Sequence, residues 1–327
     1  MIFKILRHVF ICIIPLIFIK PGFLAAESIA QIQQKPDLQT LNNAKINILA
    51  IIKLTNFTIN GFKASELSGL AWDNDENILY ALSDNGYLLH LRPVFKGNEL
   101  ADILLLNGYF LHDSKGNQLK WKQSDSEGLA IKYGNNGIPG DTELLICFER
   151  HPRIIQYNTD GSYKDEIKLP LKLQDINNYQ SENKSLEAIT LHPTLGVLVG
   201  TEQPLIKNKS NKHNVFSLNG EHWDVLSSQI TNSGLSDMTT FENGDLLILE
   251  RGFSGLWPTF EFTLHRVSIN SHDVVSEIIA TFPANNGVFN DNFEGITQYK
   301  DDYFFMVSDD NNHPFKRTLL IYFKILK

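Results

Sequence analysis

The chain has 327 residues, of which 43% are hydrophobic and 20% are charged, and its formal net charge is −8. This is an ordinary globular composition with ample material for a core. The negative charge and the lack of a Lys/Arg cluster argue against a nucleic acid or an anionic membrane as partner, because both require basic patches.

Residues 1–26 have the pattern of a secretory signal. Three basic residues lie within the first eight, an apolar core covers 9–19, and small residues at 24–26 offer a cleavage site. The apolar run is shorter than the ~20 residues of a spanning helix. We therefore expect an exported protein, in the periplasm or outside the cell, without a stable membrane span after cleavage. Cleavage after Ser28 or Ala30, or an uncleaved anchor, are the alternatives.

The next segment, 27–45, is polar and rich in Gln and Asn, which predicts a flexible tether before a single domain over 46–327. Once the signal is removed, Cys147 is the only cysteine, so an intramolecular disulfide is impossible. It lies in the apolar run 144–148, and we expect it to be a buried small hydrophobe.

From Ile46 onward the chain alternates between short apolar runs and tight-turn signals such as Asp160-Gly161, Asn219-Gly220 and Asn243-Gly244. No segment shows a sustained helical period. The sequence therefore predicts an all-β fold.

A motif recurs five times. In each copy an acidic or small polar residue precedes a short apolar run, and an acidic residue follows the next apolar run. The opening residues are Ser68, Glu127, Glu187, Asp237 and Glu294, at intervals of 59, 60, 50 and 57 residues. The closing residues are Asp84, Glu149, Glu202, Glu250 and Asp309. A period of this size is typical of propellers, in which each repeat is one supersecondary unit.

Each repeat is predicted to form four strands; in the third they cover 186–192, 196–202, 214–218 and 223–227. The last repeat ends one strand short, and the unpaired apolar segment 46–59 can supply the missing strand. Pairing it with the C-terminal blade closes the ring and removes the exposed edge. We therefore predict a β-propeller of five four-stranded blades. A sixth could lie in 98–124 or 170–184.

Strand direction predicts where the repeated acids lie. The first strand of a blade is innermost and the second is antiparallel to it, so the start of one and the end of the other share one end of the blade. All nine acids of the motif should therefore line one mouth of the central channel. Carboxylate and amide oxygens with few histidines favour Ca²⁺ over zinc as a bound cation.

These positions define the candidate site residues. The metal ligands are the closing acids Asp84, Glu149, Glu202, Glu250 and Asp309. The catalytic residues are Glu127, Glu187, Asp237 and Glu294, with Arg150 and Arg251 to stabilise an anionic transition state. The substrate-binding residues are His151, Lys207, Trp257, His313 and Arg317. The expected substrate is a small-molecule ester or phosphate ester, and the expected protein is a monomer.

Structural roles are the alternative for every one of these residues. The acids could accept hydrogen bonds from backbone amides of neighbouring blades, and the arginines could only neutralise the acids. The glycines after the acids, Gly128 and Gly295, are expected to meet backbone requirements. Trp72, Trp121 and Trp223 are expected to pack in the core or between blades.

Two stretches resemble the most specific segments of the phytase-like family, "esterase-like activity of phytase". They are 234–238 followed by 243–253, and 292–296 with 307–318; shorter likenesses extend the resemblance over most of 60–325. The resemblance implies an exported bacterial β-propeller that hydrolyses esters or phosphate esters. The chain departs from β-propeller phytases, because 66–70 replaces their Asp-Asp-Pro-Ala motif and the basic phosphate site is thin. It therefore implies a smaller phosphate ester, or another ester, rather than phytate.

Overall fold

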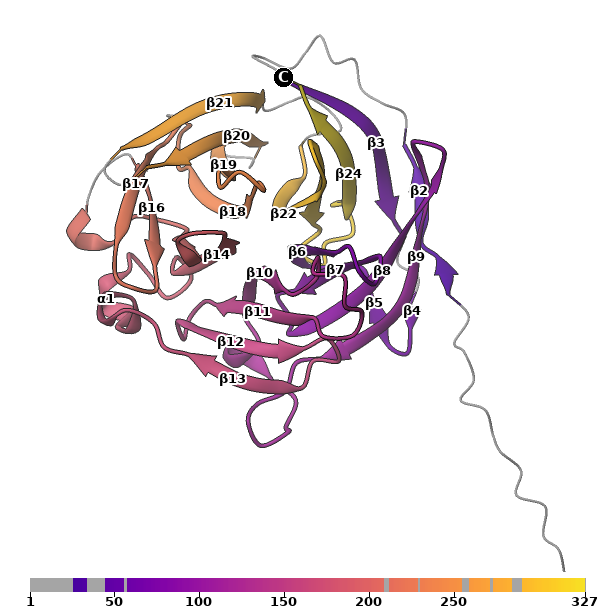
Figure 1. Cartoon of the computed structure of the whole chain (residues 1–327), viewed down its shortest axis with the longest axis horizontal. Coiled ribbons are helices and arrows are strands. Elements are labelled where there is room, and N and C mark those ends of the chain that lie inside the picture. The colour runs from indigo at the N-terminus through magenta and orange to yellow at the C-terminus, as the bar shows by residue number, and fades with distance from the viewer. Residues whose placement is uncertain are drawn as a thin grey trace, which may run out of the picture.

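The computed structural model describes residues 26–33, 45–55, 58–208, 212–228, 230–254, 259–270, 273–283 and 290–326. Five antiparallel sheets surround a central channel as the blades of a propeller, which confirms the predicted fold class (Figure 1). The stretches 98–124 and 170–184 hold no sixth sheet. The first contains an outer strand of blade one, and the second contains α1 (Leu171–Gln174) and the 3₁₀ turn η3 (Ile176–Asn178).

Within each blade the strands follow one another from the channel outward. Blade one contains β6 (Leu67–Asp73), β7 (Ile78–Ser83), β8 (Tyr87–Lys96) and β9 (Glu99–Phe110); blade two contains β10 (Ser126–Lys132), β11 (Glu143–Phe148), β12 (Arg153–Asn158) and β13 (Tyr163–Ile167). Blade three contains β14 (Leu186–His192), β15 (Gly196–Thr201), β16 (Lys212–Ser217) and β17 (His222–Leu226); blade four contains β18 (Gly234–Thr240), β19 (Leu246–Ser254), β20 (Thr259–Ile269) and β21 (Val274–Phe282). Blade five contains β22 (Asn292–Lys300), β23 (Tyr303–Asp309) and β24 (Leu319–Ile325).

The N-terminal segment completes blade five, as predicted. Strand β3 (Ile46–Leu54) pairs antiparallel with β24, from Ile325 opposite Ile46 to Leu319 opposite Lys53. It ends at Leu54, whereas the sequence predicted a strand to residue 59; Thr58–Ile59 instead form β4, which pairs with β5 (Phe62–Lys63).

Two further short strands lie within the segment that was expected to be a tether. Strand β1 (Glu27–Ser28) pairs with β9 of blade one, and β2 (Ala30–Ile32) pairs with β3 of blade five. Ile29 between them is fully buried. The segment therefore bridges the first and last blades. The predicted signal core and residues 34–44 lie outside the described residues, so the signal and the rest of the tether stay predictions.

The hydrophobic core lies between the blades. Five buried clusters each join residues of two neighbouring blades; for example, Tyr80 and Leu88 of blade one pack with Leu144 and Phe148 of blade two. Cys147 is buried in one of these clusters, as predicted. Because every cluster draws on two blades, no blade buries its apolar faces alone. No helix in the described part of the chain has the length and apolarity to cross a bilayer.

Candidate metal centre

A β-bulge at the start of each first strand fixes which residue faces the channel. In all five blades the register with the second strand shifts by one residue at this point, so one extra residue stands in the first strand. Such bulges re-aim a side chain. The residues at the equivalent inserted position are Ser68, Glu127, Glu187, Ser236 and Glu294.

The same register identifies the equivalent residues at the end of the second strands. In blade two, for example, Ser126 precedes the bulge and pairs with Phe148, and the equivalent residue is the next one along, Glu149. The same rule identifies one residue in each of the other blades. The five residues are Asp84, Glu149, Glu202, Arg251 and Asp309. Together, the two sets hold seven carboxylates, two serines and one arginine. We call these ten residues the acidic mouth.

The acids of blades two and three come closest together. One oxygen each of Asp125, Glu127 and Glu149 lie within 4.8 Å of one another, and so do oxygens of Glu149, Glu187 and Glu202. Glu149 belongs to both groups and is buried. The sequence reasoning missed Asp125, because it lies outside the repeat. Its position two residues before Glu127, at the entry to the first strand, is the signal that could have found it.

Burial and mutual repulsion raise the pKa of several of these acids. Burial, with the charge of Glu202, raises the pKa of Glu149 to about 8. Burial, with the charges of Asp309 and Glu66, raises the pKa of Asp84 to about 9, and burial with Glu294 raises that of Asp309 to about 7. One oxygen of Asp84, Oδ1, is buried without a hydrogen-bond partner. These groups therefore need protons or a cation at neutral pH.

Arg251 is the basic member of the acidic mouth. Its guanidinium pairs with Glu294 and donates a hydrogen bond to Asn292 Oδ1 at 2.5 Å. Burial lowers its pKa, but the charges of Glu294, Glu187 and Glu202 outweigh this and raise it. Arg251 thus places one fixed positive charge opposite the acids of blades two and three.

Blade four corrects the predicted alignment by one residue. Strand pairing places Ser236 and Arg251, not Asp237 and Glu250, at the positions that Glu127 and Glu149 occupy in blade two. Asp237 instead accepts hydrogen bonds from the backbone amides of Met238, at 2.8 Å, and of Ile296 in blade five, at 2.7 Å. Asp237 therefore has the structural role that was the alternative for these acids, because it accepts hydrogen bonds from buried backbone amides.

Glu250 lies in a buried cluster with two histidines. Its carboxylate is 2.6 Å from His265 Nε2 and 3.2 Å from His213 Nε2, and it accepts hydrogen bonds from Ser227 Oγ and Ser228 N. Burial raises the pKa of Glu250, but the hydrogen bonds and charges of the two histidines outweigh it and hold the pKa far below its usual range. This cluster joins blades three and four.

The remaining predicted residues lie around the acidic mouth rather than in it. Arg150 pairs with Asp125, and Arg317 pairs with Asp291 at 2.5 Å. The side chains of His151, Lys207 and His313 are exposed on the connections that follow second strands. Trp257 lies outside the described residues.

The structure also settles the expected structural roles. A Cβ at Gly128 would lie 2.8 Å from the backbone nitrogen of Ile189, so the close approach of blade three requires glycine there. Trp72 packs edge-on against Tyr299, with ring centroids 4.7 Å apart. Trp223 packs partly buried at the interface of blades three and four. Trp121 does not pack: it is 91% exposed, which corrects its predicted place in the core.

Residues 63–312 match the family model described as phytase-like, esterase-like activity of phytase. The chain belongs to the phytase-like family. The match includes all ten residues of the acidic mouth. No curated protein matches the chain. Among solved structures, a crystal structure of glucose dehydrogenase aligns over 93% of this chain and 100% of its own, at 11% identity and a TM-score of 0.41.

The donor set of this phytase-like propeller fits a hard cation. All candidate ligand atoms of the two groups that share Glu149 are carboxylate oxygens, the ligands that Ca²⁺ takes in sets of 6–8. Burial and the charge of Glu202 raise the pKa of Glu149, the acid shared by both groups, so its ionised form lacks a partner that a cation could supply. Asp125, Glu127, Glu149, Glu187 and Glu202 would hold the ion.

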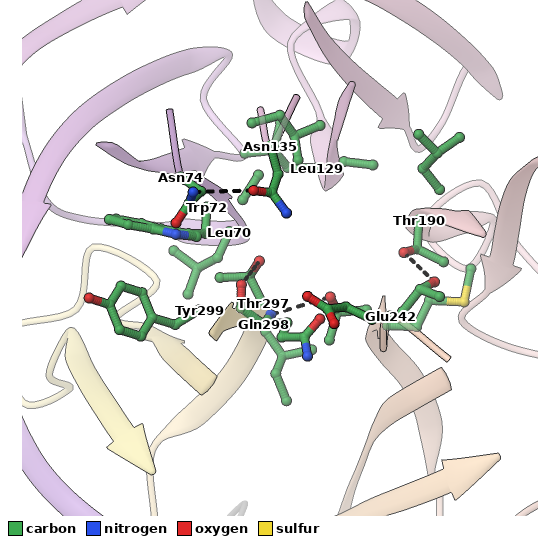
Figure 2. Close-up of a pocket in the computed structure, with 18 of the residues that line it drawn as sticks. Leu70, Trp72, Asn74, Leu129, Asn135, Thr190, Glu242, Thr297, Gln298 and Tyr299 are labelled. Carbon is green, nitrogen blue, oxygen red and sulfur yellow. Dashed lines mark hydrogen bonds between the residues drawn. The ribbon is translucent and has the colours of Figure 1, made fainter. Parts of the chain in front are cut away.

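A separate pocket lies at the other mouth of the phytase-like propeller. Its volume is about 400 Å³ (Figure 2). All five first strands contribute residues to its lining, among them Leu70, Leu129, Thr190, Met238 and Ile296. Because first strands run from the acidic mouth to this pocket, the two sites occupy opposite ends of the channel. None of the predicted site residues lines it.

Proposed function

We propose that this chain is an exported, metal-dependent hydrolase that cleaves a phosphate ester or another ester at the acidic mouth. The observation that supports this most directly is the pair of carboxylate groups that share Glu149, within 4.8 Å in each group. Family membership supports a hydrolase-like propeller. A bound divalent cation, with Ca²⁺ as our proposal, would polarise the scissile group and lower the pKa of water.

The chain's own residues supply the other requirements of such a site. Arg251 is fixed by Glu294 and Asn292 and would orient an anionic group and stabilise developing negative charge. Burial, with the charge of Glu202, raises the pKa of Glu149 to about 8, which suits a carboxyl group that holds or accepts a proton near neutral pH, and burial also raises the pKa of Glu187. The substrate would be a small molecule, the class that membership of the phytase-like family makes plausible.

A non-catalytic propeller, in which the cation only stabilises the ring and a ligand binds above it, is the second candidate. One observation favours it: the arginines nearest the acids, Arg150 and Arg251, are both engaged in ion pairs with carboxylates. In this case the acidic mouth would require the cation for stability alone.

Hydrolysis of a panel of chromogenic phosphate and carboxylate esters, measured with Ca²⁺ and with chelator, tests both. The hydrolase predicts chelator-sensitive turnover that Glu149→Gln reduces by at least about 100-fold, because the shared ligand is lost. The matched control is Glu242→Gln, an exposed acid at the opposite mouth, which should leave turnover unchanged. Absence of turnover with every ester, together with a large chelator-induced fall in Tm, would support the non-catalytic propeller.

A further inference from the structure

The most exposed large apolar side chains gather on one face of the propeller. Among the described residues the three highest exposures are those of Trp121 at 91%, Phe315 at 90% and Leu171 at 81%. They come from the segments between β9 and β10, between β23 and β24, and between β13 and β14. Ile206, between β15 and β16, is 44% exposed. Side chains this exposed are available for contact with another surface.

Strand direction places all four residues on the face of the acidic mouth. First strands leave that face and second strands return to it, so every connection after a second or a fourth strand lies there. The four segments belong to these two types. The exposed apolar residues therefore lie on connections of the face that holds the acidic mouth, and they come from several blades.

Each of the four apolar residues is followed directly by a lysine. The pairs are Trp121-Lys122, Leu171-Lys172, Ile206-Lys207 and Phe315-Lys316. Neighbouring aromatic or aliphatic and basic side chains suit a lipid interface, where the apolar group enters the acyl boundary and the ammonium stays among the headgroups. The pairs are up to 194 residues apart in sequence (from 121 to 315), so only the fold brings them to one face.

The first-to-second-strand turns of the opposite face are acidic. The turns that join first to second strands, 74–77, 133–142, 193–195, 241–245 and 301–302, contain seven acids and neither lysine nor arginine. An anionic surface would repel this face and attract the lysines around the acidic mouth.

The backbone holds Trp121 in its exposed position. Its φ of 59° lies in the left-handed region, which is costly for an aromatic residue. Ser124 compensates by donating hydrogen bonds from its amide and its hydroxyl to the Trp121 carbonyl, at 2.9 and 2.7 Å. The indole is therefore presented outward by a fixed turn.

We propose that the face of the acidic mouth docks peripherally on a lipid surface that contains anionic headgroups. The four apolar residues enter the interface, and the lysines contact the headgroups. The buried carboxylates of the acidic mouth stay recessed at the centre. This docking does not depend on the proposed hydrolysis, and it leaves the acidic turns facing water.

Co-sedimentation of the full chain with vesicles tests the proposal. We expect binding to vesicles of phosphatidylcholine with phosphatidylglycerol, and at least about tenfold weaker binding to phosphatidylcholine alone, because each lysine near an anionic surface contributes about fivefold. Trp121→Ser with Phe315→Ser should reduce binding by at least about tenfold. Lys122→Gln with Lys207→Gln should weaken the preference for anionic lipid by about 25-fold or to the point of loss, because two of the four lysines are removed.

Ile138→Ser is the matched control, because Ile138 is 57% exposed on a turn of the opposite face. It should bind like the unaltered chain. All five residues changed, the control included, are exposed, so each variant should keep its Tm. Binding that the Trp121 and Phe315 changes leave intact would belong to another segment, such as the apolar run 9–19, and would overturn the proposal. Failure to bind either vesicle, or an equal loss in Ile138→Ser, would overturn it as well.

Discussion

Blades two and four carry the same sequence motif but use its acids in opposite ways. In blade two, Glu127 and Glu149 stand at the two mouth positions, and each has a pKa raised mainly by burial. In blade four the acids are displaced by one residue: Asp237 accepts backbone amides of its own blade and of blade five, and Glu250 binds two buried histidines. A one-residue shift in a strand exchanges its two faces. The same residue type therefore carries uncompensated charge in one blade and satisfies buried groups in the other.

Among substitutions of these acids, Glu250→Ala should cause the largest loss of stability. Removal of the carboxylate leaves His213 and His265 without their shared partner in a fully buried site, which costs about 3–5 kcal/mol of unfolding free energy. The control is Glu202→Ala at the acidic mouth, whose contact is Lys184 at 3.6 Å and whose loss should cost no more than about 1 kcal/mol. Urea unfolding of both variants measures the difference. Equal losses would contradict distinct roles for the two acids.

The pH dependence of stability should separate the two groups of acids by sign. Glu149, Asp84 and Asp309 have folded pKa values of about 8, 9 and 7, above their ordinary values, so the folded state keeps protons that the unfolded state loses. Stability without a cation should therefore fall as the pH rises from about 5 through about 9, the range between the ordinary pKa values and the raised ones. Glu250, with its lowered pKa, contributes stability above about pH 4.5 that is lost in acid.

Melting curves across this range, with Ca²⁺ and with chelator, provide the measurement. A cation at the acidic mouth compensates the carboxylates, so Ca²⁺ should flatten the fall on the alkaline side and leave the acid side unchanged. An alkaline slope that is the same with Ca²⁺ and with chelator would show that Glu149 does not hold the ion.

Asp237→Asn should produce the smallest change. The two amides donate to different carboxylate oxygens, Oδ1 and Oδ2, so asparagine keeps one acceptor and places its NH2 group against the other amide. The unfolding free energy should therefore fall by about 1 kcal/mol. Asp237→Ala leaves both amides without this acceptor and should cost about 1–3 kcal/mol. Thermal unfolding ranks the two variants. A large loss of cation affinity in Asp237→Asn would instead return Asp237 to the metal centre.

Much of the fold could be predicted because its signals are local. The alternation of apolar runs and Asn-Gly or Asp-Gly turns indicated strands one by one, and the third repeat was predicted at 186–192 and 196–202 against observed strands at 186–192 and 196–201. The apolar segment from Ile46 indicated the closing strand. Strand direction then placed seven of the nine predicted carboxylates at the acidic mouth.

The rest depends on register and on contacts that no local pattern encodes. Asp237-Met238 has the same appearance in sequence as Glu127-Gly128, and only the position of the bulge opposite Leu249 separates them. Asp125 joins the metal centre through a loop outside the repeat. Trp121 was expected to pack because tryptophan usually does, whereas its exposure follows from a turn closed by Ser124.

Closure of the ring by β3 and β24 has a consequence for the order of folding. The two strands come from opposite ends of the chain, so blade five cannot form until residues 319–325 have been synthesised. Until then β3 and β23 each present an unpaired edge, and such edges promote aggregation. The ring of blades therefore closes only in the last step of folding. A chain that lacks β24 would lose the closure of the ring and not only one strand.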